Sequence, residues 1–309
     1  MKDSISKNVI DFSVGERRNI QMEREVELRA GEIIKRYRLH KYICCAIVVL
    51  DVIFLFYMVF FKMDSWFSYY VGGFASFLLT VSVFALYAVI AAIAVFVKWI
   101  GAVKVDLALY EECDPFVYEA CLNKLHTFFY KDRLTCLHAI AQYYQGNIHG
   151  AEEILRGVNL YKLKGMFRVN YYIILSAVFF QKGEGMRAAE LEQSYRAGIK
   201  KKSKREQMYF RMLCAGNNLY RAMENKDYES AFRFLAERKE YESGKTRKWS
   251  LIGYSMWEAR ICAAMGDKES ARQRLNYVIA EGGRLVHVAE ARKLLLEING
   301  TADGESENG

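Results

Sequence analysis

The chain has 309 residues, of which 52% are hydrophobic and 14% aromatic, and its formal net charge is +8 at pH 7. The seven cysteines include no CxxC pair, which disfavours both a secreted disulfide framework and a zinc site. The single proline, Pro115, argues for long uninterrupted helices, because proline breaks helices, and no segment shows the alternating pattern of a strand. We therefore predict an all-α protein.

The segment before the first apolar run, residues 1–41, is predicted to form a charged cytosolic N-terminal helix. Ser13 followed three residues later by Glu16 matches a capping box, which predicts that the helix starts at this point. Basic and acidic residues alternate along the rest of the segment, as on a solvated helix surface. We expect this helix to lead the chain into the membrane.

Two apolar runs, residues 42–61 and 71–97, predict a transmembrane hairpin over residues 42–105. A helix needs about 20 apolar residues to cross the hydrocarbon core, so both runs are long enough. Trp66 and Trp99 lie near the edges of the runs, as aromatic anchors at membrane interfaces do. The connecting loop is short, so the two helices should be antiparallel neighbours.

The charges that flank the spans predict the orientation of the hairpin. Lys and Arg are frequent in residues 1–41, whereas Lys62 is the one basic residue of the loop between the runs. Segments rich in Lys and Arg stay on the cytoplasmic side of a membrane. We therefore expect an integral protein of a bacterial-type inner membrane, with both termini and the region after the second span in the cytoplasm.

Asp51 lies near the middle of the first span. A carboxylate at this depth costs about 2.5–3.5 kcal/mol on insertion scales, so it should be buried against the partner helix. Three polar residues of the second span reach a similar depth in an antiparallel hairpin: Thr80, Ser82 and Tyr87. We favour a hydrogen-bonded lock between the helices. The alternatives are contact with a second membrane protein and an ion or proton relay.

Residues 106–298 repeat one pattern. Asp114 followed by Pro115 predicts the start of a new helix, because aspartate is a good N-cap and proline suits the first helical position. Beyond it, four segments share a helix end, a turn and a new helix: QYYQGNIHGAEEIL, VFFQKGEGMRAAEL, YRAMENKDYESAFR and CAAMGDKESARQRL. The turn residues, each five positions before an alanine, are Gly146, Gly183, Lys226 and Gly266.

This pattern resembles the tetratricopeptide-repeat family, whose unit is a helix, a tight turn and a second helix with small residues where the two helices pack. The matching small residues are Ala139, Ser176 and Ala259 on first helices and Ala151, Ala188, Ala231 and Ala271 on second helices. Leu155, Leu235 and Leu275 follow four positions after three of these alanines.

The chain departs from the family pattern in several places. The turns are about 40 residues apart, whereas the family period is about 34 residues. Leu219 replaces the small residue of the third unit, and Glu192 replaces the apolar residue of the second. The resemblance implies a tetratricopeptide-like α-solenoid over residues 106–298 that ends in a capping helix, Arg284–Ile298. Residues 299–309 are expected to form a disordered tail.

The resemblance implies that the concave surface of the solenoid binds a protein or peptide partner. The candidate residues of this groove are Asn170, Tyr171, Asn217, Tyr220, Arg221, Trp257 and Arg260. Together with the hairpin they predict a membrane-anchored scaffold or adaptor. The alternative is an accessory subunit of a transport or secretion complex that is contacted through Asp51. The sequence contains no phosphate-binding loop, metal-ligand spacing or nucleophile motif, so we expect neither an enzyme nor a cofactor.

A basic cluster separates the second unit from the third. It consists of Lys200, Lys201, Lys202, Lys204 and Arg205. Contact with anionic lipid headgroups, worth about 1 kcal/mol per basic residue near the surface, and a solvated loop are equally favoured here. Nucleic acid is the least favoured partner, because no recognition motif accompanies the cluster.

Overall fold

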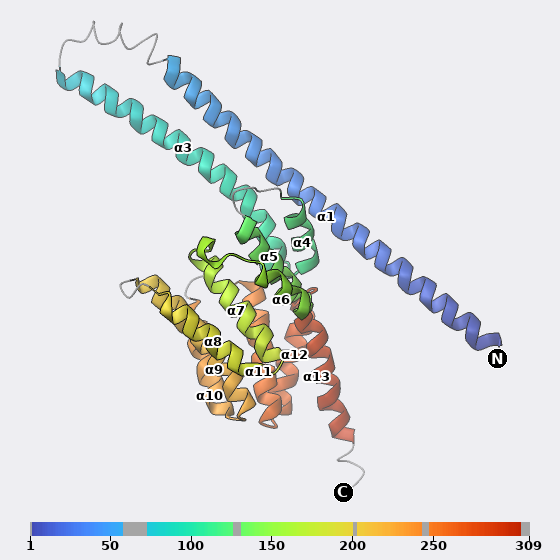
Figure 1. Cartoon of the computed structure of the whole chain (residues 1–309). Helices are drawn as coiled ribbons and strands as arrows, with labels where there is room; N and C mark the ends of the chain where they lie inside the picture. Colours follow the sequence, from blue (N-terminus) through green and yellow to red (C-terminus); the bar gives the residue numbers. More distant parts are fainter. Residues whose placement is uncertain (1, 58–72, 126–130, 200–202, 243–246, 304–309) are drawn as a thin grey trace. The chain divides into compact units, whose positions relative to one another are not determined.

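The computed structural model describes residues 2–57, 73–125, 131–199, 203–242 and 247–303, and of residues 2–19, 73–80 and 301–303 it describes the backbone alone. In these ranges all regular structure is helical and no strand occurs, so the prediction of an all-α chain is confirmed (Figure 1). The chain divides into two compact units, Met1–Leu107 and Ala108–Gly309.

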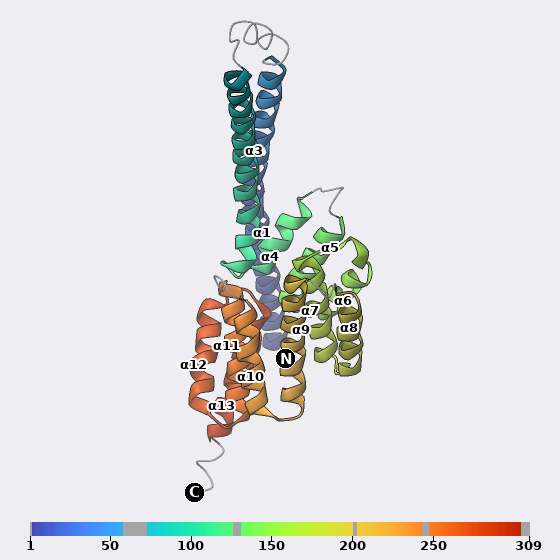
Figure 2. The same cartoon turned by 90° about the vertical axis from the view of Figure 1, so that its left-hand side faces the viewer.

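The first unit consists of two long antiparallel helices that lie side by side, α1 (Lys2–Tyr57) and most of α3 (Gly73–Tyr110) (Figures 1 and 2). Both helices are long and apolar enough to cross a membrane, at Ile20–Tyr57 and Val81–Tyr110. The rings of Phe54 and Tyr87 approach each other with their centroids 6.2 Å apart, which connects the two helices.

Three sequence boundaries differ from the structure or lie outside it. The predicted helix start at Ser13 is wrong, because α1 is already helical at Lys2. The predicted tail is also wrong at its start, because α13 (Val286–Asp303) continues beyond Ile298. Residues 58–61 of the first predicted span and residues 71–72 of the second lie outside the described ranges.

The second unit begins with the last residues of α3 and continues as a series of helices. They are α4 (Pro115–Asn123), α5 (Lys131–Tyr144), α6 (Ile148–Arg156), the short 3-10 helix η2 (Leu160–Lys162), α7 (Met166–Gln181), α8 (Gly185–Ala197), α9 (Lys204–Glu224), α10 (Tyr228–Tyr241), α11 (Lys248–Ala264), α12 (Lys268–Glu281) and α13. Consecutive helices pack as the pairs α5–α6, α7–α8, α9–α10 and α11–α12, and the last pair is clearly seen in Figure 2.

The start of α4 agrees with the sequence. Asp114 is the N-cap, and its Oδ1 accepts hydrogen bonds from the backbone N–H groups of Phe116 and Val117 at 3.2 and 3.1 Å. Pro115 occupies the first helical position, where its missing N–H is not needed. Asp114 Oδ2 also lies 3.5 Å from a guanidinium nitrogen of Arg284, which ties the start of the unit to the residues just before α13.

All four predicted turn residues have positive φ, the conformation that ends a helix and reverses the chain. The φ angles are +88° at Gly146, +72° at Gly183, +57° at Lys226 and +84° at Gly266. In three of the pairs an Asn or Asp directly after the turn caps the second helix through its side chain. The helix–turn–helix pattern of the sequence is therefore present at each of the four positions.

The small residues of the repeat pattern are buried in the core of the second unit. Ala139, Ala151, Ala188, Ala231, Ala259 and Ala271 are fully buried, and Ser176 is 1% exposed. The leucines four positions later, Leu155, Leu235 and Leu275, are also buried, and each contributes about 1.5–3 kcal/mol through burial of its side chain. Leu219, which replaces a small residue, joins one core cluster with Ala231 and Leu235.

Candidate ligand-binding cavity

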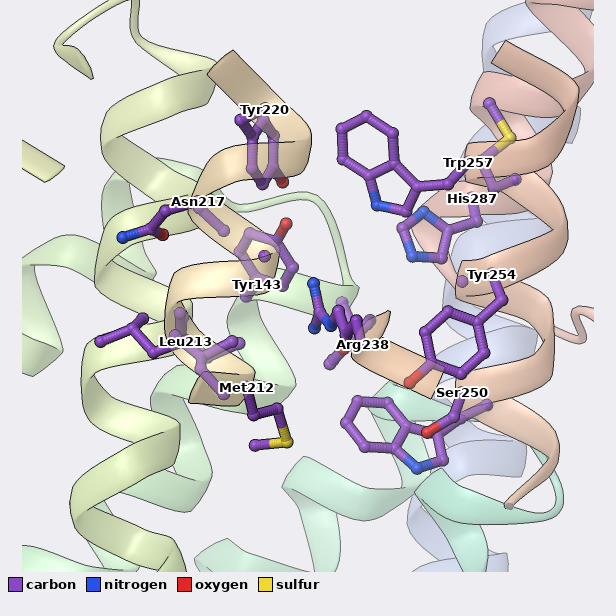
Figure 3. A pocket seen from close by; sticks show the side chains of 18 of the residues that line it. Tyr143, Met212, Leu213, Asn217, Tyr220, Arg238, Ser250, Tyr254, Trp257 and His287 are labelled. Atoms are coloured by element: carbon purple, nitrogen blue, oxygen red, sulfur yellow. The ribbon is translucent and has the colours of Figure 1, made fainter. Parts of the chain in front are cut away.

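The second unit contains a cavity of about 80 Å³, lined by residues of α5, α7, α9, α10, α11 and α13 together with Glu242, the C-cap of α10 (Figure 3). Aromatic side chains form part of its wall. The rings belong to Tyr143, Tyr144, Tyr220, Trp249, Tyr254 and Trp257.

Edge-to-face ring contacts fix this wall and connect helices of different pairs. Tyr220 on α9 meets Trp257 on α11 with centroids 4.7 Å apart, and Tyr144 on α5 meets Trp249 on α11 at 4.9 Å. Such ring pairs contribute about 0.5–1.5 kcal/mol each beyond the burial of their area. These ring contacts therefore hold part of the cavity wall in place.

Burial keeps the tyrosine hydroxyls of the cavity neutral. It raises the pKa of Tyr143, Tyr144, Tyr220 and Tyr254 above the ordinary value of 10.0. At neutral pH these hydroxyls therefore serve as hydrogen-bonding groups and carry no charge.

Arg238 is a lining residue at a position of the repeat that holds valine or tyrosine in the other pairs. It follows Ala231 by seven residues and Leu235 by three, which places it on the inward face of α10. The matching positions of the other pairs hold Val158, Tyr195 and Val278. An arginine therefore replaces an apolar residue in the third pair only.

Gly216 on α9 makes room for this arginine. A Cβ atom at Gly216 would lie 3.1 Å from Arg238 Nη1, which is closer than ordinary van der Waals contact. Figure 3 shows the guanidinium between Tyr143 and Leu213 on one side and Tyr254 on the other. The absence of a side chain at Gly216 on α9 thus leaves space for the guanidinium of Arg238 on α10.

The guanidinium of Arg238 is incompletely satisfied. Its Nε is buried and has no hydrogen-bond partner among the described residues, and the same is true of the Tyr254 hydroxyl. Burial alone would lower the pKa of Arg238, but Tyr254 and Glu242 outweigh it and hold this pKa above its ordinary value. The side chain therefore stays cationic inside the cavity.

The predicted groove residues divide into two groups. Asn217, Tyr220, Trp257 and Arg260 line the cavity, so the structure brings these four together. Asn170, Tyr171 and Arg221 do not line it, and Tyr171 is a buried residue on α7.

Glu192 on α8 explains the position of Arg221. Its Oε2 accepts hydrogen bonds from Arg221 Nη2 and Asn217 Nδ2, each at 3.0 Å. The departure of Glu192 from the apolar repeat position thus has a structural reason, because the carboxylate pairs with polar groups of α9. Arg221 is engaged in this contact.

Arg260 is also paired. Its Nη2 lies 3.0 Å from Glu290 Oε2 on α13, and His287 Nδ1 lies 3.1 Å from the same oxygen. Burial would raise the pKa of Glu290, but the His287 hydrogen bond and the Arg260 charge together hold it below 4.5. Glu290 is therefore ionised at neutral pH, and its carboxylate pairs with the positive charge of Arg260.

Within the described ranges no candidate metal site occurs, and three buried or partly buried thiols are not activated. No group of three or more His, Cys, Asp or Glu placed to hold a metal ion occurs there. Burial raises the pKa of Cys136 and Cys214 to about 12 and that of Cys113 to about 11, so these thiols stay protonated.

The polar residues that are predicted to lie within the membrane are only partly described. Asp51 Oδ1 and the Tyr87 hydroxyl are buried and have no hydrogen-bond partner among the described residues. Ser82 is exposed on α3, and the side chain of Thr80 lies outside the description. The predicted lock between the helices stays a prediction.

The basic cluster is also described in part. Lys200, Lys201 and Lys202 lie outside the described ranges, whereas Lys204 and Arg205 are exposed in the first turn of α9. Arg205 Nε donates a hydrogen bond to the Tyr209 hydroxyl at 2.7 Å, so part of its donor capacity is used within the helix.

Arg238 is the residue that the sequence interpretation missed. The available signal was its register, because a charged residue stands where the matching positions of the other three pairs hold valine or tyrosine. Comparison of the chain with protein-family models, with curated proteins and with solved structures finds no match. The functional interpretation therefore depends on the geometry of the cavity.

Proposed function

We propose that this protein is a membrane-anchored scaffold or adaptor. In this proposal the two spans of α1 and α3 hold it in the membrane, and the unit Ala108–Gly309 is a cytoplasmic, tetratricopeptide-like solenoid that binds a protein or peptide partner. The four packed helix pairs and their positive-φ turns support the solenoid. The abundance of Lys and Arg before the first span supports the cytoplasmic orientation.

The aromatic cavity at Arg238 is the observation that carries the proposal. Tyrosine, tryptophan and arginine are the residues that most often dominate binding energy at protein interfaces. Here they converge from separate helix pairs onto one concave site, and donors at Arg238 and Tyr254 have no partner within the described residues. Such an arrangement suits a ligand that supplies the missing acceptor.

In this proposal, membrane attachment determines where the bound partner is held. A partner bound to a tethered domain is held within reach of other membrane components, and its effective concentration there reaches about the millimolar range when the linkage is short. The mechanism is therefore recruitment. It needs no reaction chemistry in the cavity.

A second candidate function uses the hairpin itself. Asp51 Oδ1 is buried on α1 and has no hydrogen-bond partner among the described residues. Placing a carboxylate within a bilayer costs free energy, so such a residue is a candidate for a functional role. In this alternative the protein is an accessory subunit of a transport or secretion complex, and a polar group of another membrane protein pairs with Asp51.

Site-specific photo-crosslinking in native membranes distinguishes the two functions. A photoreactive phenylalanine analogue replaces Trp257 at the cavity, Phe54 in the hairpin or Tyr161 on η2 in three versions of the full-length chain. Tyr161 is 97% exposed and does not line the cavity, so it is the control for random collisions.

The scaffold proposal predicts discrete protein adducts from position 257 that are absent from position 161. Adducts from position 54 alone would contradict it and would favour the accessory-subunit function. The same experiment on a full-length Asp51→Asn variant tests whether hairpin adducts depend on the carboxylate.

A further inference from the structure

The start and the end of the second unit contact each other. The carbonyl oxygen of Cys113, just before α4, accepts a hydrogen bond from the backbone N–H of Arg284 at 2.9 Å. The Arg284 guanidinium lies 3.5 Å from Asp114 Oδ2, and its Cζ lies 4.4 Å from the centroid of the Phe116 ring. Asp114 and Arg284 are 170 positions apart. Because the repeats of an array contact only their neighbours, this contact is additional to the repeat packing.

The first helix pair meets the same end of the chain. Tyr144, the last residue of α5, contacts the rings of Trp249 and His287 with centroids 4.9 and 5.9 Å apart. A Cβ atom at Gly146 would lie 2.9 Å from Val286 Cγ2. Tyr144, Trp249 and His287 all line the cavity, so these contacts lie at its wall. The clasp is the name used below for the contacts of residues 113–116 with 283–284 and of residues 144–146 with 249, 286 and 287.

The backbone is strained at the clasp. Cys113 has a φ of +55°, a left-handed conformation that L-residues rarely adopt. Gly283 has a φ of +56°, and a Cβ there would lie 2.8 Å from the Cys113 carbonyl oxygen. Strained residues persist only where surrounding contacts hold them, and they are concentrated at switch regions and ligand clamps. Release of the Arg284 contacts would allow Cys113 to relax.

The cavity behind the clasp is too small for a peptide. Its volume of about 80 Å³ holds about half a dozen water molecules, at about 10–15 Å³ each. A peptide residue has more non-hydrogen atoms than this space accepts, so a peptide reaches Tyr220 and Trp257 only if the surrounding helices separate. The helices on the two sides of the clasp, α4–α6 and α11–α13, pack less closely on one another than consecutive helices do. The clasp is therefore the boundary at which separation disrupts least packing.

We propose that the clasp controls access to the cavity, and that the partner peptide enters when the contacts of Arg284 and Tyr144 break. In the closed state the clasp excludes the partner. In the open state α4–α6 and α11–α13 move apart and expose the aromatic wall. The inference deepens the proposed function and rests on it, because the peptide belongs to the recruited partner.

Alkylation of Cys113 measures the opening without a partner. The side chain is fully buried at the clasp, so N-ethylmaleimide reaches it only through opening. Peptide mass spectrometry gives the rates on the full-length protein in detergent, and each rate is divided by that of the same cysteine in denaturant. Cys136 Sγ lies 3.5 Å from the Phe167 carbonyl oxygen, away from the clasp, so Cys136 reports wider unfolding. Cys113 should react faster than Cys136.

Arg284→Gln weakens the clasp, because it removes the charge beside Asp114 and above the Phe116 ring. It should accelerate the alkylation of Cys113 about tenfold. The rate of Cys136 should not change. Arg292→Gln is the matched control, since Arg292 is exposed on α13 and the same charge is removed.

A disulfide tests whether opening admits the partner. A Cβ at Gly146 would lie 3.6 Å from Val286 Cβ, within the range of about 3.5–4.5 Å for disulfides. Gly146→Cys with Val286→Cys should lock the clasp when oxidised, and the reduced form of this double variant controls for the substitutions themselves. With the photoreactive analogue at position 257, adducts in membranes should form after reduction and be lost after oxidation. The chain with Gly146 and Val286 should keep its adducts in the same oxidant.

Adducts that survive oxidation of the double variant would overturn the inference. So would a Cys113 rate that does not exceed that of Cys136, or that Arg284→Gln leaves unchanged. If the double variant fails to fold, adduct yields decide, because Arg284→Gln should give more adducts at position 257 than Arg292→Gln does. Rapid Cys113 alkylation without any adducts at position 257 would reject the scaffold function, and the control of access with it, while the opening itself would stand.

Discussion

Lys226 offers a direct test of the repeat interpretation, because it occupies a turn position that the other three helix pairs give to glycine. Its φ is +57°, a left-handed conformation that costs an L-residue about 1–2 kcal/mol. Glycine avoids this cost but loses about 0.5–1 kcal/mol more conformational entropy on folding. Lys226 is exposed, so its side chain gives up little packing. We expect Lys226→Gly to stabilise the protein by about 0.5–1 kcal/mol.

The reverse substitutions separate backbone strain from steric contact. At Gly183 and Gly266 an added Cβ would meet no atom within 4 Å, so alanine there should cost only the backbone term, about 1 kcal/mol. At Gly146 the Cβ would lie 2.9 Å from Val286 Cγ2. Gly146→Ala should therefore destabilise the protein more than the other two substitutions.

Thermal unfolding of the full-length chain in detergent, followed by the loss of helical circular dichroism, measures this series. For a unit of this size 1 kcal/mol corresponds to about 2–4 °C in the midpoint. The expected order is Lys226→Gly highest, then wild type, then Gly183→Ala with Gly266→Ala, then Gly146→Ala. A lower midpoint for Lys226→Gly, or no change for both Gly183→Ala and Gly266→Ala, would refute the reasoning.

Two further predictions concern the packing and the charges of the second unit. Leu275→Ala should cost about 2–5 kcal/mol in the free energy of unfolding, because Leu275 is fully buried, whereas Leu296→Ala at a 73% exposed site should cost little; chemical denaturation of both variants compares them. Glu152 is buried with its Oε2 2.9 Å from Lys182 Nζ, and this hydrogen bond holds its pKa below the ordinary 4.5. The stability it contributes is present above the unfolded-state pKa and is lost as pH falls through the lower folded-state pKa. Glu152→Gln should therefore lie below wild type at neutral pH and approach it below about pH 4, as midpoints over a pH series would show; a constant difference would contradict the assignment.

The sequence predicts features that depend on local pattern. The turns and the small residues of the repeat follow from spacing along one helix pair. Gly183, for example, has the positive φ of a turn, and Ala188 is buried. The start of α1 was not predicted, because the capping pattern at Ser13 also fits the interior of a longer helix, where its groups need not cap anything.

The cavity could not be predicted in the same way, because its parts come from different pairs. Arg238 on α10 needs Gly216 on α9 for space and Tyr143 on α5 for one wall, and these residues are distant in the sequence. Arg221 and Arg260 were expected in the groove on residue type. Their ion pairs with Glu192 and Glu290 depend on helix packing, and the sequence alone does not reveal them.

The third helix pair departs from the repeat pattern at three positions. The structural effect of each departure differs. Leu219 takes the place of a small residue but is fully buried against Ala231, so the fold gains packing from it. Lys226 has a strained, left-handed backbone conformation at an exposed turn. Arg238 differs from both, because Gly216 accommodates its bulk while its buried Nε has no hydrogen-bond partner among the described residues. A side chain that fits the fold but keeps an unpaired hydrogen-bond donor is typical of a binding site, because a ligand can supply the acceptor. Arg238 is therefore the position at which loss of function should separate most cleanly from loss of fold.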